Sequence, residues 1–176
     1  MKGIYLFFLI LIATSFGGTC HAEETTQKIK VLIVTGGHGF EKEPFFAIFK
    51  DNPEITFTNA LHSKTNASAY DRDDLLSYDV VVLYDIGQTI SDKQKKNFLS
   101  LFDAGKGLVV LHHAIVSYQG WPDYEGIIGG RYPEDPAKSG VVTPEVGYQH
   151  DVEIPVVVAA TNHPVTAGIK YFTILD

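Results

Sequence analysis

The sequence predicts an α/β fold, with helices on both faces of a mostly parallel β-sheet. Three short apolar runs are typical of strands buried on both faces, and segments with helical spacing lie between them. Of the 176 residues, 45% are hydrophobic and 20% are charged, a balance that excludes fibrous and disordered chains. The length suits about one domain, so we expect a single three-layer α/β/α unit.

The first half of the predicted domain contains three strands and a helix. Residues 30–35 are rich in β-branched side chains and stop at two glycines, the pattern of a buried strand. Residues 41–50 carry phenylalanines that are spaced to form one face of a helix. Residues 54–58 alternate as a second strand, and the unbroken apolar run at residues 79–84 predicts the third.

Ser91 begins the next predicted helix. Its hydroxyl suits the N-cap position, and Gln94, three residues later, completes a capping box. Apolar residues continue at helical spacing to Ala104, and Gly105 then favours a helix end. Residues 108–111 predict the fourth strand because they form the third uninterrupted apolar run.

Beyond the fourth strand the pattern is looser. Residues 121–128 predict a short helix, and residues 129–147, rich in Gly, Pro and charge, predict a long loop or insertion. Residues 152–159 and 171–175 predict two further strands. Pro155 places the first of these at a sheet edge or beside a bulge, because proline cannot donate to the strand ladder.

The N-terminal residues have the pattern of a secretory signal peptide. Lys2 precedes an uncharged apolar run at residues 4–13, and small residues surround Cys20 and Ala22. The run is shorter than the roughly 20 residues that span a bilayer, so we expect cleavage after Ala22 and no transmembrane anchor afterwards. Lipidation at Cys20 is the alternative, and either route predicts export, to the periplasm or the medium. The chain then divides into signal peptide, linker and α/β domain, at residues 1–22, 23–29 and 30–176.

Charge and cysteine content exclude several functions. The chain has 14 Lys and Arg against 21 Asp and Glu, a formal net charge of −7. Binding to nucleic acid draws its affinity from clustered cations, so we expect no nucleic-acid partner. Cys20 is the single cysteine, so cleavage after Ala22 would remove thiol chemistry and Cys-ligated metal sites from the mature chain.

Polar side chains follow three of the predicted parallel strands. His38 follows the first strand, Tyr84 and Asp85 follow the third, and His112 and His113 follow the fourth. In open parallel sheets, ligands bind outside the carboxyl ends of the strands, so we expect these side chains around one pocket. Imidazoles and a carboxylate suit general acid–base catalysis or the binding of a divalent metal.

A structural role is the alternative for each of these residues. Gly36 and Gly37 would then serve only the turn, Asp85 would cap a helix, and one of the two adjacent histidines would be buried and hydrogen-bonded. If His112 and His113 lie in extended chain, their side chains face opposite ways and only one can point into the site. The sequence has no helical His-Glu-x-x-His pattern and no cysteine cluster, so a divalent cofactor rests on scattered histidines alone.

Aromatic residues near an arginine suggest that the ligand is a small-molecule carbohydrate. Trp121, Tyr124 and Tyr132 lie near Arg131 in a segment punctuated by glycines. Aromatic faces stack on the apolar faces of sugar rings, and arginine binds hydroxyl groups. The alternative is that Trp121 and Tyr124, three residues apart, form one buried face of a helix.

The remaining histidines are predicted away from these strand ends. His163 precedes a proline, so it is either a turn residue or a further contact for the ligand. His62 is expected at the surface, as is the glycosylation sequon at residues 66–68.

Five segments occur in a distinctive order along the domain. They are Val-Leu-Ile-Val-Thr-Gly-Gly-His, Tyr-Asp, Gly-Lys-Gly-Leu-Val-Val-Leu-His-His-Ala, Trp-Pro-Asp-Tyr with Ile-Gly-Gly-Arg-Tyr, and Asn-His-Pro-Val-Thr-Ala-Gly-Ile. Together they resemble the ThuA-like (trehalose utilisation) family, from Lys30 to Asp176. The resemblance implies a flavodoxin-like three-layer fold related to the class I glutamine amidotransferases. It also implies a role in sugar catabolism, often discussed for oxidised (3-keto) disaccharides.

The sequence departs from the amidotransferases at the turn that carries their nucleophilic cysteine. The matching segment is Leu-His-His-Ala at residues 111–114, which has no thiol, so the glutaminase mechanism cannot run. Family members usually continue past the Ile-Leu-Asp at residues 174–176 with a glutamate and an aromatic-containing segment. We therefore expect a sequence that is truncated at its C-terminus.

Two functions from different classes fit these observations. The first is an exported carbohydrate-active enzyme of hydrolase or lyase type. In it His112 or His113 acts as acid or base with His38, Asp85 polarises a partner, and the aromatic residues stack the sugar. The second is a non-catalytic sugar-binding or accessory domain of a secreted protein, which would use its histidines structurally.

Overall fold

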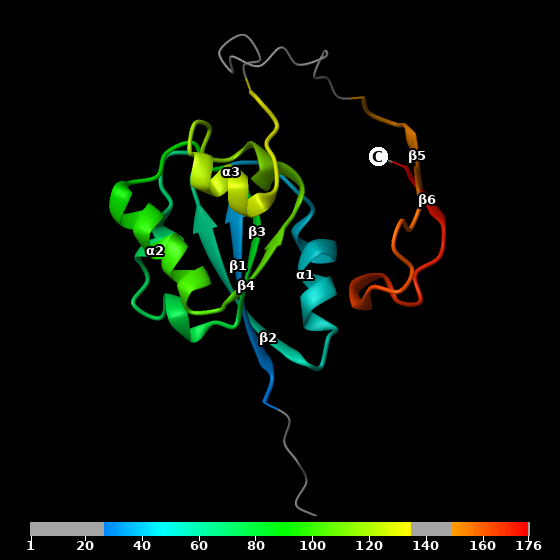
Figure 1. Cartoon of the computed structure of the whole chain (residues 1–176), viewed down its shortest axis with the longest axis horizontal. Helices are drawn as coiled ribbons and strands as arrows, with labels where there is room; N and C mark the ends of the chain where they lie inside the picture. Colours follow the sequence, from blue (N-terminus) through cyan, green and yellow to red (C-terminus); the bar gives the residue numbers. More distant parts are fainter. Residues whose placement is uncertain (1–26, 135–148, 176) are drawn as a thin grey trace, which may run out of the picture.

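The computed structural model, which describes residues 27–134 and 149–175, is built around a four-stranded sheet. The strands are β1 (Ile29–Gly36), β2 (Ile55–His62), β3 (Val80–Asp85) and β4 (Gly107–Val110). All four run parallel, in the spatial order β2-β1-β3-β4 (Figure 1). This confirms the predicted parallel sheet. The predicted signal peptide, most of the predicted linker and most of the predicted loop at 129–147 lie outside the described residues.

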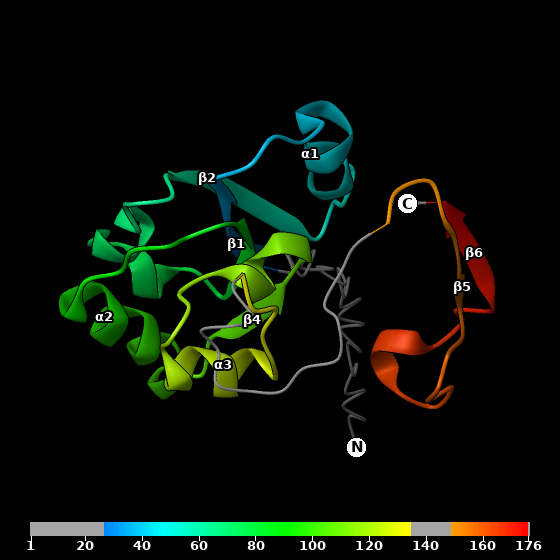
Figure 2. The same ribbon diagram turned by 90° about the horizontal axis from the view of Figure 1, so that it is seen from above.

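Helices cover both faces of the sheet. α1 (Lys42–Lys50) packs on one face, and α2 (Asp92–Asp103) and α3 (Pro122–Ile128) pack on the other (Figures 1 and 2). The arrangement is a three-layer α/β/α sandwich of flavodoxin-like type, as the sequence predicts.

Two hydrophobic cores form because successive side chains of β1 and β3 point to opposite faces. The core on the α2 side includes Leu32, Val34, Val81, Leu83, Phe98 and Leu101. The core on the α1 side includes Val31, Ile33, Val82, Phe45, Phe46 and Phe49. The apolar strands therefore stabilise the fold from both faces, which explains why their sequences show no polar alternation.

The predicted capping box of α2 is present. The side-chain oxygen of Ser91 accepts a hydrogen bond from the backbone N–H of Gln94 at 3.2 Å, and Oε1 of Gln94 accepts one from the backbone N–H of Ser91 at 3.0 Å. The helix ends at Asp103, and Gly105 follows with φ +67°, the left-handed conformation that glycine tolerates.

Several strand ends differ from the sequence prediction, and those of β2 and β4 have a clear structural reason. β2 continues to His62 because it pairs with β1 over its whole length, from Ile55 opposite Ile29 to His62 opposite Gly36. β4 ends at Val110 because the chain turns into a 3₁₀ helix, η3 (His112–Val116). The other 3₁₀ helices in the described residues are η1 (Ser68–Asp71), η2 (Leu75–Ser77) and η4 (Pro164–Thr166).

The two predicted C-terminal strands form a separate antiparallel pair. They are β5 (Glu153–Val156) and β6 (Phe172–Leu175), with Pro155 opposite Thr173. Both figures show the pair apart from the four-stranded sheet. Every residue of a two-stranded ladder lies at an edge, so Pro155 is tolerated there, as predicted. Across both described ranges, no helix is long and apolar enough to cross a membrane.

Candidate functional site: three histidines beside a pocket

Three histidines meet at the carboxyl edge of the sheet. His38 follows β1, and His112 and His113 are the first two residues of η3, just beyond β4. The ring centroid of His38 lies 4.7 Å from that of His113 and 5.8 Å from that of His112. The centroids of His112 and His113 are 3.8 Å apart. The fold therefore gathers three of the four side chains that the sequence nominates for catalysis, at the edge where parallel sheets bind ligands.

A two-glycine turn carries the chain from β1 to His38. Gly36 has φ +128° and Gly37 has φ +77°, conformations that disfavour other residues. A Cβ on Gly36 would lie 2.0 Å from the carbonyl oxygen of His62, and one on Gly37 would lie 2.3 Å from that of Ile86. Glycine is therefore required at both positions for the backbone to approach β2 and the segment after β3.

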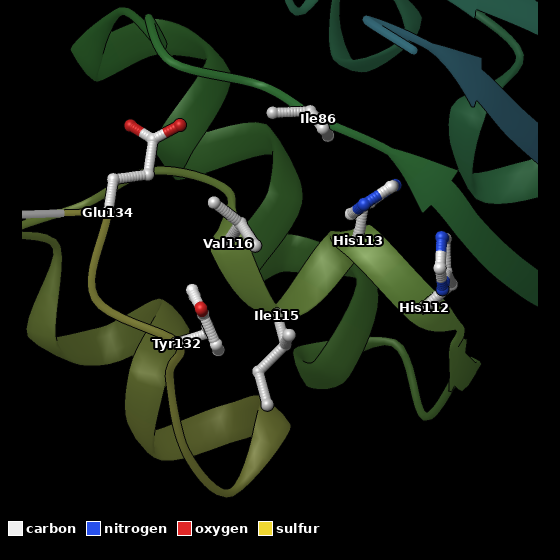
Figure 3. A pocket seen from close by; sticks show the side chains of 7 residues that line it. All are labelled: Ile86, His112, His113, Ile115, Val116, Tyr132 and Glu134. Atoms are coloured by element: carbon white, nitrogen blue, oxygen red, sulfur yellow. The ribbon is translucent and has the colours of Figure 1, made fainter. Parts of the chain in front are cut away.

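His112 has a strained backbone at the turn between β4 and η3. Its φ is +50°, in the left-handed region that non-glycine residues seldom adopt, and such strain is concentrated at functional sites. The expectation that only one of His112 and His113 points into the site assumes extended chain, and neither residue is extended. Both side chains contact the same pocket (Figure 3).

The pocket beside the histidines has a volume of about 710 Å³. This lies within the range of about 300–1,000 Å³ that is usual for small-molecule sites. Figure 3 shows apolar side chains together with two imidazoles, a phenol and a carboxylate around it. The described residues that line it are Ile86, His112, His113, Ile115, Val116, Tyr132 and Glu134.

His113 is the histidine whose ionisation the site changes. Burial lowers its pKa below the ordinary 6.5, and the neighbouring His112, His38 and Lys64 lower it further. Its Nδ1 is buried and has no hydrogen-bond partner in the described part of the chain. At neutral pH the imidazole of His113 is therefore uncharged and can accept a proton.

Tyr84 lies with the histidines on the α1 side of the sheet. Its carbonyl oxygen is 3.1 Å from Nε2 of His38, and its ring centroid is 4.9 Å from His38 and 5.7 Å from His112. Phe45 of α1 stacks on the Tyr84 ring at 4.4 Å, and Phe40 contacts it edge-on at 5.1 Å. The phenylalanine stripe of α1, which the sequence marks only as a helix face, thus also supports the site.

Asp85 does not join the histidine cluster, so its prediction as a member of the site is corrected. Asp85 belongs to β3, where it faces the opposite side from Tyr84. The side chain is fully buried, and Oδ2 lies 2.9 Å from Nδ1 of His62. Nε2 of His62 accepts a hydrogen bond from the backbone N–H of Ala69 at 3.0 Å, so Nδ1 donates to Asp85. The prediction that His62 lies at the surface is also wrong, since it is 2% exposed at the end of β2.

Trp121 and Tyr124 belong to the core on the α2 side, so the prediction that they stack a sugar is corrected. Tyr124 is 2% exposed, and its hydroxyl donates to the carbonyl oxygen of Ala114 at 2.8 Å. Trp121 is 7% exposed, stacks on Tyr124 at 5.8 Å and has the Lys95 ammonium over its ring at 5.6 Å. Their spacing of three residues reflects a buried helix face, which is the alternative to sugar stacking for these two residues.

The other two predicted sugar contacts have local interactions. Nε of Arg131 lies 3.6 Å from Oε1 of Glu125, at the end of α3. His163 caps η4, where its Nδ1 accepts a hydrogen bond from the backbone N–H of Val165 at 3.2 Å. The turn interpretation of His163 is the one that this geometry supports.

Sequence reasoning did not assign Glu134 to the site, and it named Tyr132 only as one of the aromatic residues near Arg131. Both come from the irregular chain after α3, where no periodic pattern indicates which side chains turn inward. The proximity of Tyr132 to Arg131 and Trp121 in the sequence is the one signal that points to it. In the portion of the chain that the structure describes, no group of three or more His, Cys, Asp or Glu residues is placed to hold a metal ion.

The fold and its edge site define a flavodoxin-like α/β protein with a histidine-lined pocket. The family model for ThuA, described as trehalose utilisation, matches residues 30–176, and the chain belongs to this family.

A solved structure supports the assignment of the fold. A ThuA-like protein from Parabacteroides merdae is similar to this chain with a TM-score of 0.69 and 18% sequence identity. The match covers 84% of this chain and 60% of that protein, so the chain spans three fifths of the length of that relative. No curated protein matches the chain.

Proposed function

We propose that this protein is an enzyme of trehalose or related disaccharide utilisation that uses histidine acid–base chemistry. The observation that carries the proposal is the cluster of His38, His112 and His113 beside a pocket of about 710 Å³. Family membership supports the sugar class of the substrate. The pocket supports it too, because it combines apolar walls with a few polar groups that can orient a small molecule.

His113 is the base in this proposal. Its lowered pKa keeps the imidazole neutral at pH 7, and its position at the pocket gives it access to a bound ligand. With a 3-keto disaccharide, the imidazole takes the proton from C2, the carbon beside the carbonyl group. The electron pair left on C2 forms a double bond to C1 as the bond from C1 to the linking oxygen breaks, and the second sugar leaves with a proton on that oxygen. The neighbouring His112 and His38 supply further groups that can hold or return a proton.

Other residues of the pocket bind and orient the sugar. The carboxylate of Glu134 and the phenol of Tyr132 can hydrogen-bond to hydroxyl groups, and Ile115 and Val116 supply apolar surface for the ring. The turn after β4 presents His112 where a glutamine amidotransferase would need a thiol, so the proposal excludes glutaminase chemistry.

Export is part of the proposal and rests on the sequence of the N-terminal residues. A positive Lys2, an uncharged apolar run at residues 4–13 and small residues before Glu23 are typical of a signal peptide. The enzyme would then meet its sugar in the periplasm or outside the cell.

The proposal is tested by screening the purified chain against ordinary and 3-keto disaccharides and detecting products by mass. We expect a mass change with at least one disaccharide. The variant with His112→Ala and His113→Ala should lose turnover and keep binding, because it removes the acid–base groups and leaves most of the pocket. His163→Ala is the matched control, since His163 contacts only its own turn in the interactions described.

Two outcomes would overturn the enzyme assignment. Binding of a disaccharide without product formation would identify a sugar-binding or accessory domain. Neither binding nor product formation with any disaccharide would remove the carbohydrate assignment altogether.

A further inference from the structure

A second, smaller pocket lies next to the histidine site. It has a volume of about 200 Å³ and is formed by the segment after β3, the segment after η3 and Lys95 of α2. Most of its polar groups are uncharged, which is the chemistry that sugar hydroxyls match. Its main lining residues are Gln88, Thr89, Lys95, Tyr118, Gln119 and Trp121.

The two pockets are lined by neighbouring residues of the same two chain segments. Ile86 lines the first pocket and Gln88, two residues on, lines the second. On the facing segment, Val116 lines the first pocket and Tyr118 lines the second. Between the pockets, the backbone N–H of Tyr118 donates to the carbonyl oxygen of Gly87 at 2.7 Å. The point where these two segments are hydrogen-bonded to each other therefore separates the pockets.

Gly87 allows the two segments to approach closely at this hydrogen bond. A Cβ at this position would lie 2.6 Å from the ring of Tyr118, so only glycine lets the two segments approach so closely. The backbone N–H of Gly87 also donates to Oγ of Ser117 at 2.9 Å, and Ser117 Oγ in turn donates to the carbonyl oxygen of Asp85 at 3.2 Å. These buried bonds fix the spacing between the two pockets.

Gln119 connects the second pocket to the first. Its Nε2 donates to the carbonyl oxygen of Val116 at 2.7 Å and to that of Tyr132 at 3.1 Å. Because both amide hydrogens are used, the side chain is fixed and Oε1 remains as its acceptor. The side chain of Tyr132 lines the histidine pocket, so Gln119 joins the walls of both.

We propose that the second pocket is the subsite for the second ring of a disaccharide whose first ring occupies the histidine pocket. This deepens the proposed function and depends on it. The small volume suits one ring and excludes a whole disaccharide. Gln88 and Thr89 have exposed side chains with no hydrogen bond in the described contacts, so they are available to the hydroxyls of that ring.

Lys95 and Trp121 form the far side of this subsite. The Lys95 ammonium lies over the Trp121 ring and 3.7 Å from Oδ1 of Asp92. With Lys95 above the indole and Tyr124 stacked on it, Trp121 offers little free face to a sugar. The second ring is therefore held by hydrogen bonds rather than by aromatic stacking.

The test compares disaccharide and monosaccharide binding by the full chain and by the Gln88→Ala, Thr89→Ala double variant. The probes are trehalose and its 3-keto derivative, against glucose and 3-ketoglucose, titrated by calorimetry. We expect the disaccharide affinity to fall roughly tenfold, because hydrogen bonds to the second ring are lost, while monosaccharide affinity is unchanged. Gln27→Ala is the matched control, since Gln27 lies at the opposite end of the sheet, before β1.

Each result has a distinct meaning. Equal disaccharide affinity in the wild type and the variant, or an equal loss for both sugar classes, would overturn the subsite and leave the proposed function standing. Failure of the wild type to bind any of the four sugars would instead overturn the proposed function. Thr89→Val, which replaces only the hydroxyl by a methyl group, repeats the comparison if the double variant does not fold.

Discussion

His113 combines partial burial with two neighbouring imidazoles, and this sets how the site responds to pH. Burial and the nearby His112, His38 and Lys64 all disfavour its charged form, so its pKa lies below 6.5. The unfolded chain therefore binds more protons than the folded chain between the lowered pKa and 6.5. The stability that depends on His113 is fully present above pH 6.5 and decreases as the pH falls through the folded pKa.

The first prediction concerns the titration of this imidazole. Followed by NMR, the His113 ring should titrate with a midpoint below 6.5, and His112→Ala should raise that midpoint because it removes one of the charges that oppose protonation. Any activity that uses His113 as a base should decrease on the acidic side over the same range. A midpoint above 6.5 in the wild type would contradict the assignment of His113 as the neutral base.

Single residues also show where sequence reasoning stops. The positive φ of His112 places two adjacent histidines on one pocket, and nothing in a Leu-His-His-Ala segment predicts that conformation, because a non-glycine residue seldom adopts it. The glycine turn before His38, in contrast, can be predicted from the sequence. Two consecutive glycines after an apolar run already indicate a tight turn at the strand end.

At the scale of elements, the lengths of β2 and β3 decide which polar residues reach the site. The sequence predicts strand ends at residue 58 and at residue 84, which leaves His62 and Asp85 in loops. In the structure both strands continue to these residues. The hydrogen bond between His62 and Asp85 then joins the ends of β2 and β3 on the α2 side of the sheet. Since Tyr84 and Asp85 are neighbours in a strand, they cannot face the same side. Only Tyr84 contacts the cluster of His38 and His112.

The second prediction follows from this tie between β2 and β3. Asp85→Ala should lower the free energy of unfolding by about 1–3 kcal/mol, because it leaves the buried Nδ1–H of His62 without an acceptor. Asp85→Asn keeps an acceptor oxygen and should cost less. Urea denaturation measures both, with Asp73→Ala as an exposed control. Equal stability of Asp85→Ala and the wild type would show that the pair does not hold the two strands together.

At the scale of the whole molecule, the sequence predicts the fold well and the pocket less well. The apolar runs of β1 and β3 require a covered sheet, and the carboxyl edge of such a sheet is where His38, His112 and His113 meet. The pocket walls depend on Tyr132 and Glu134, which come from irregular chain without periodicity. Trp121, whose place near Arg131 in the sequence suggests stacking on a sugar, instead belongs to the core.

Many of the residues that stabilise the sheet lie on its α2 side. On the α2 side, the His62–Asp85 pair and the aromatic core around Tyr124 stabilise the sheet. On the α1 side, Tyr84 supports the histidines, two of which line the pocket at the carboxyl edge. Substitutions of Asp85 or Tyr124 should therefore change stability, whereas substitutions at the histidine pocket should change ligand binding and turnover.

Hydrogen exchange into a bound sugar tests the central claim, that His113 abstracts a proton in this pocket, most directly. A 3-keto disaccharide is incubated with the protein in D₂O, and deuterium at the carbon beside the carbonyl group is followed by NMR. We expect the wild type to accelerate the exchange. The His113→Ala variant should still bind the sugar, but its exchange rate should be roughly 10²–10⁴-fold lower than that of the wild type. Exchange at the rate seen without protein, or equal exchange by His113→Ala and the wild type, would contradict the account.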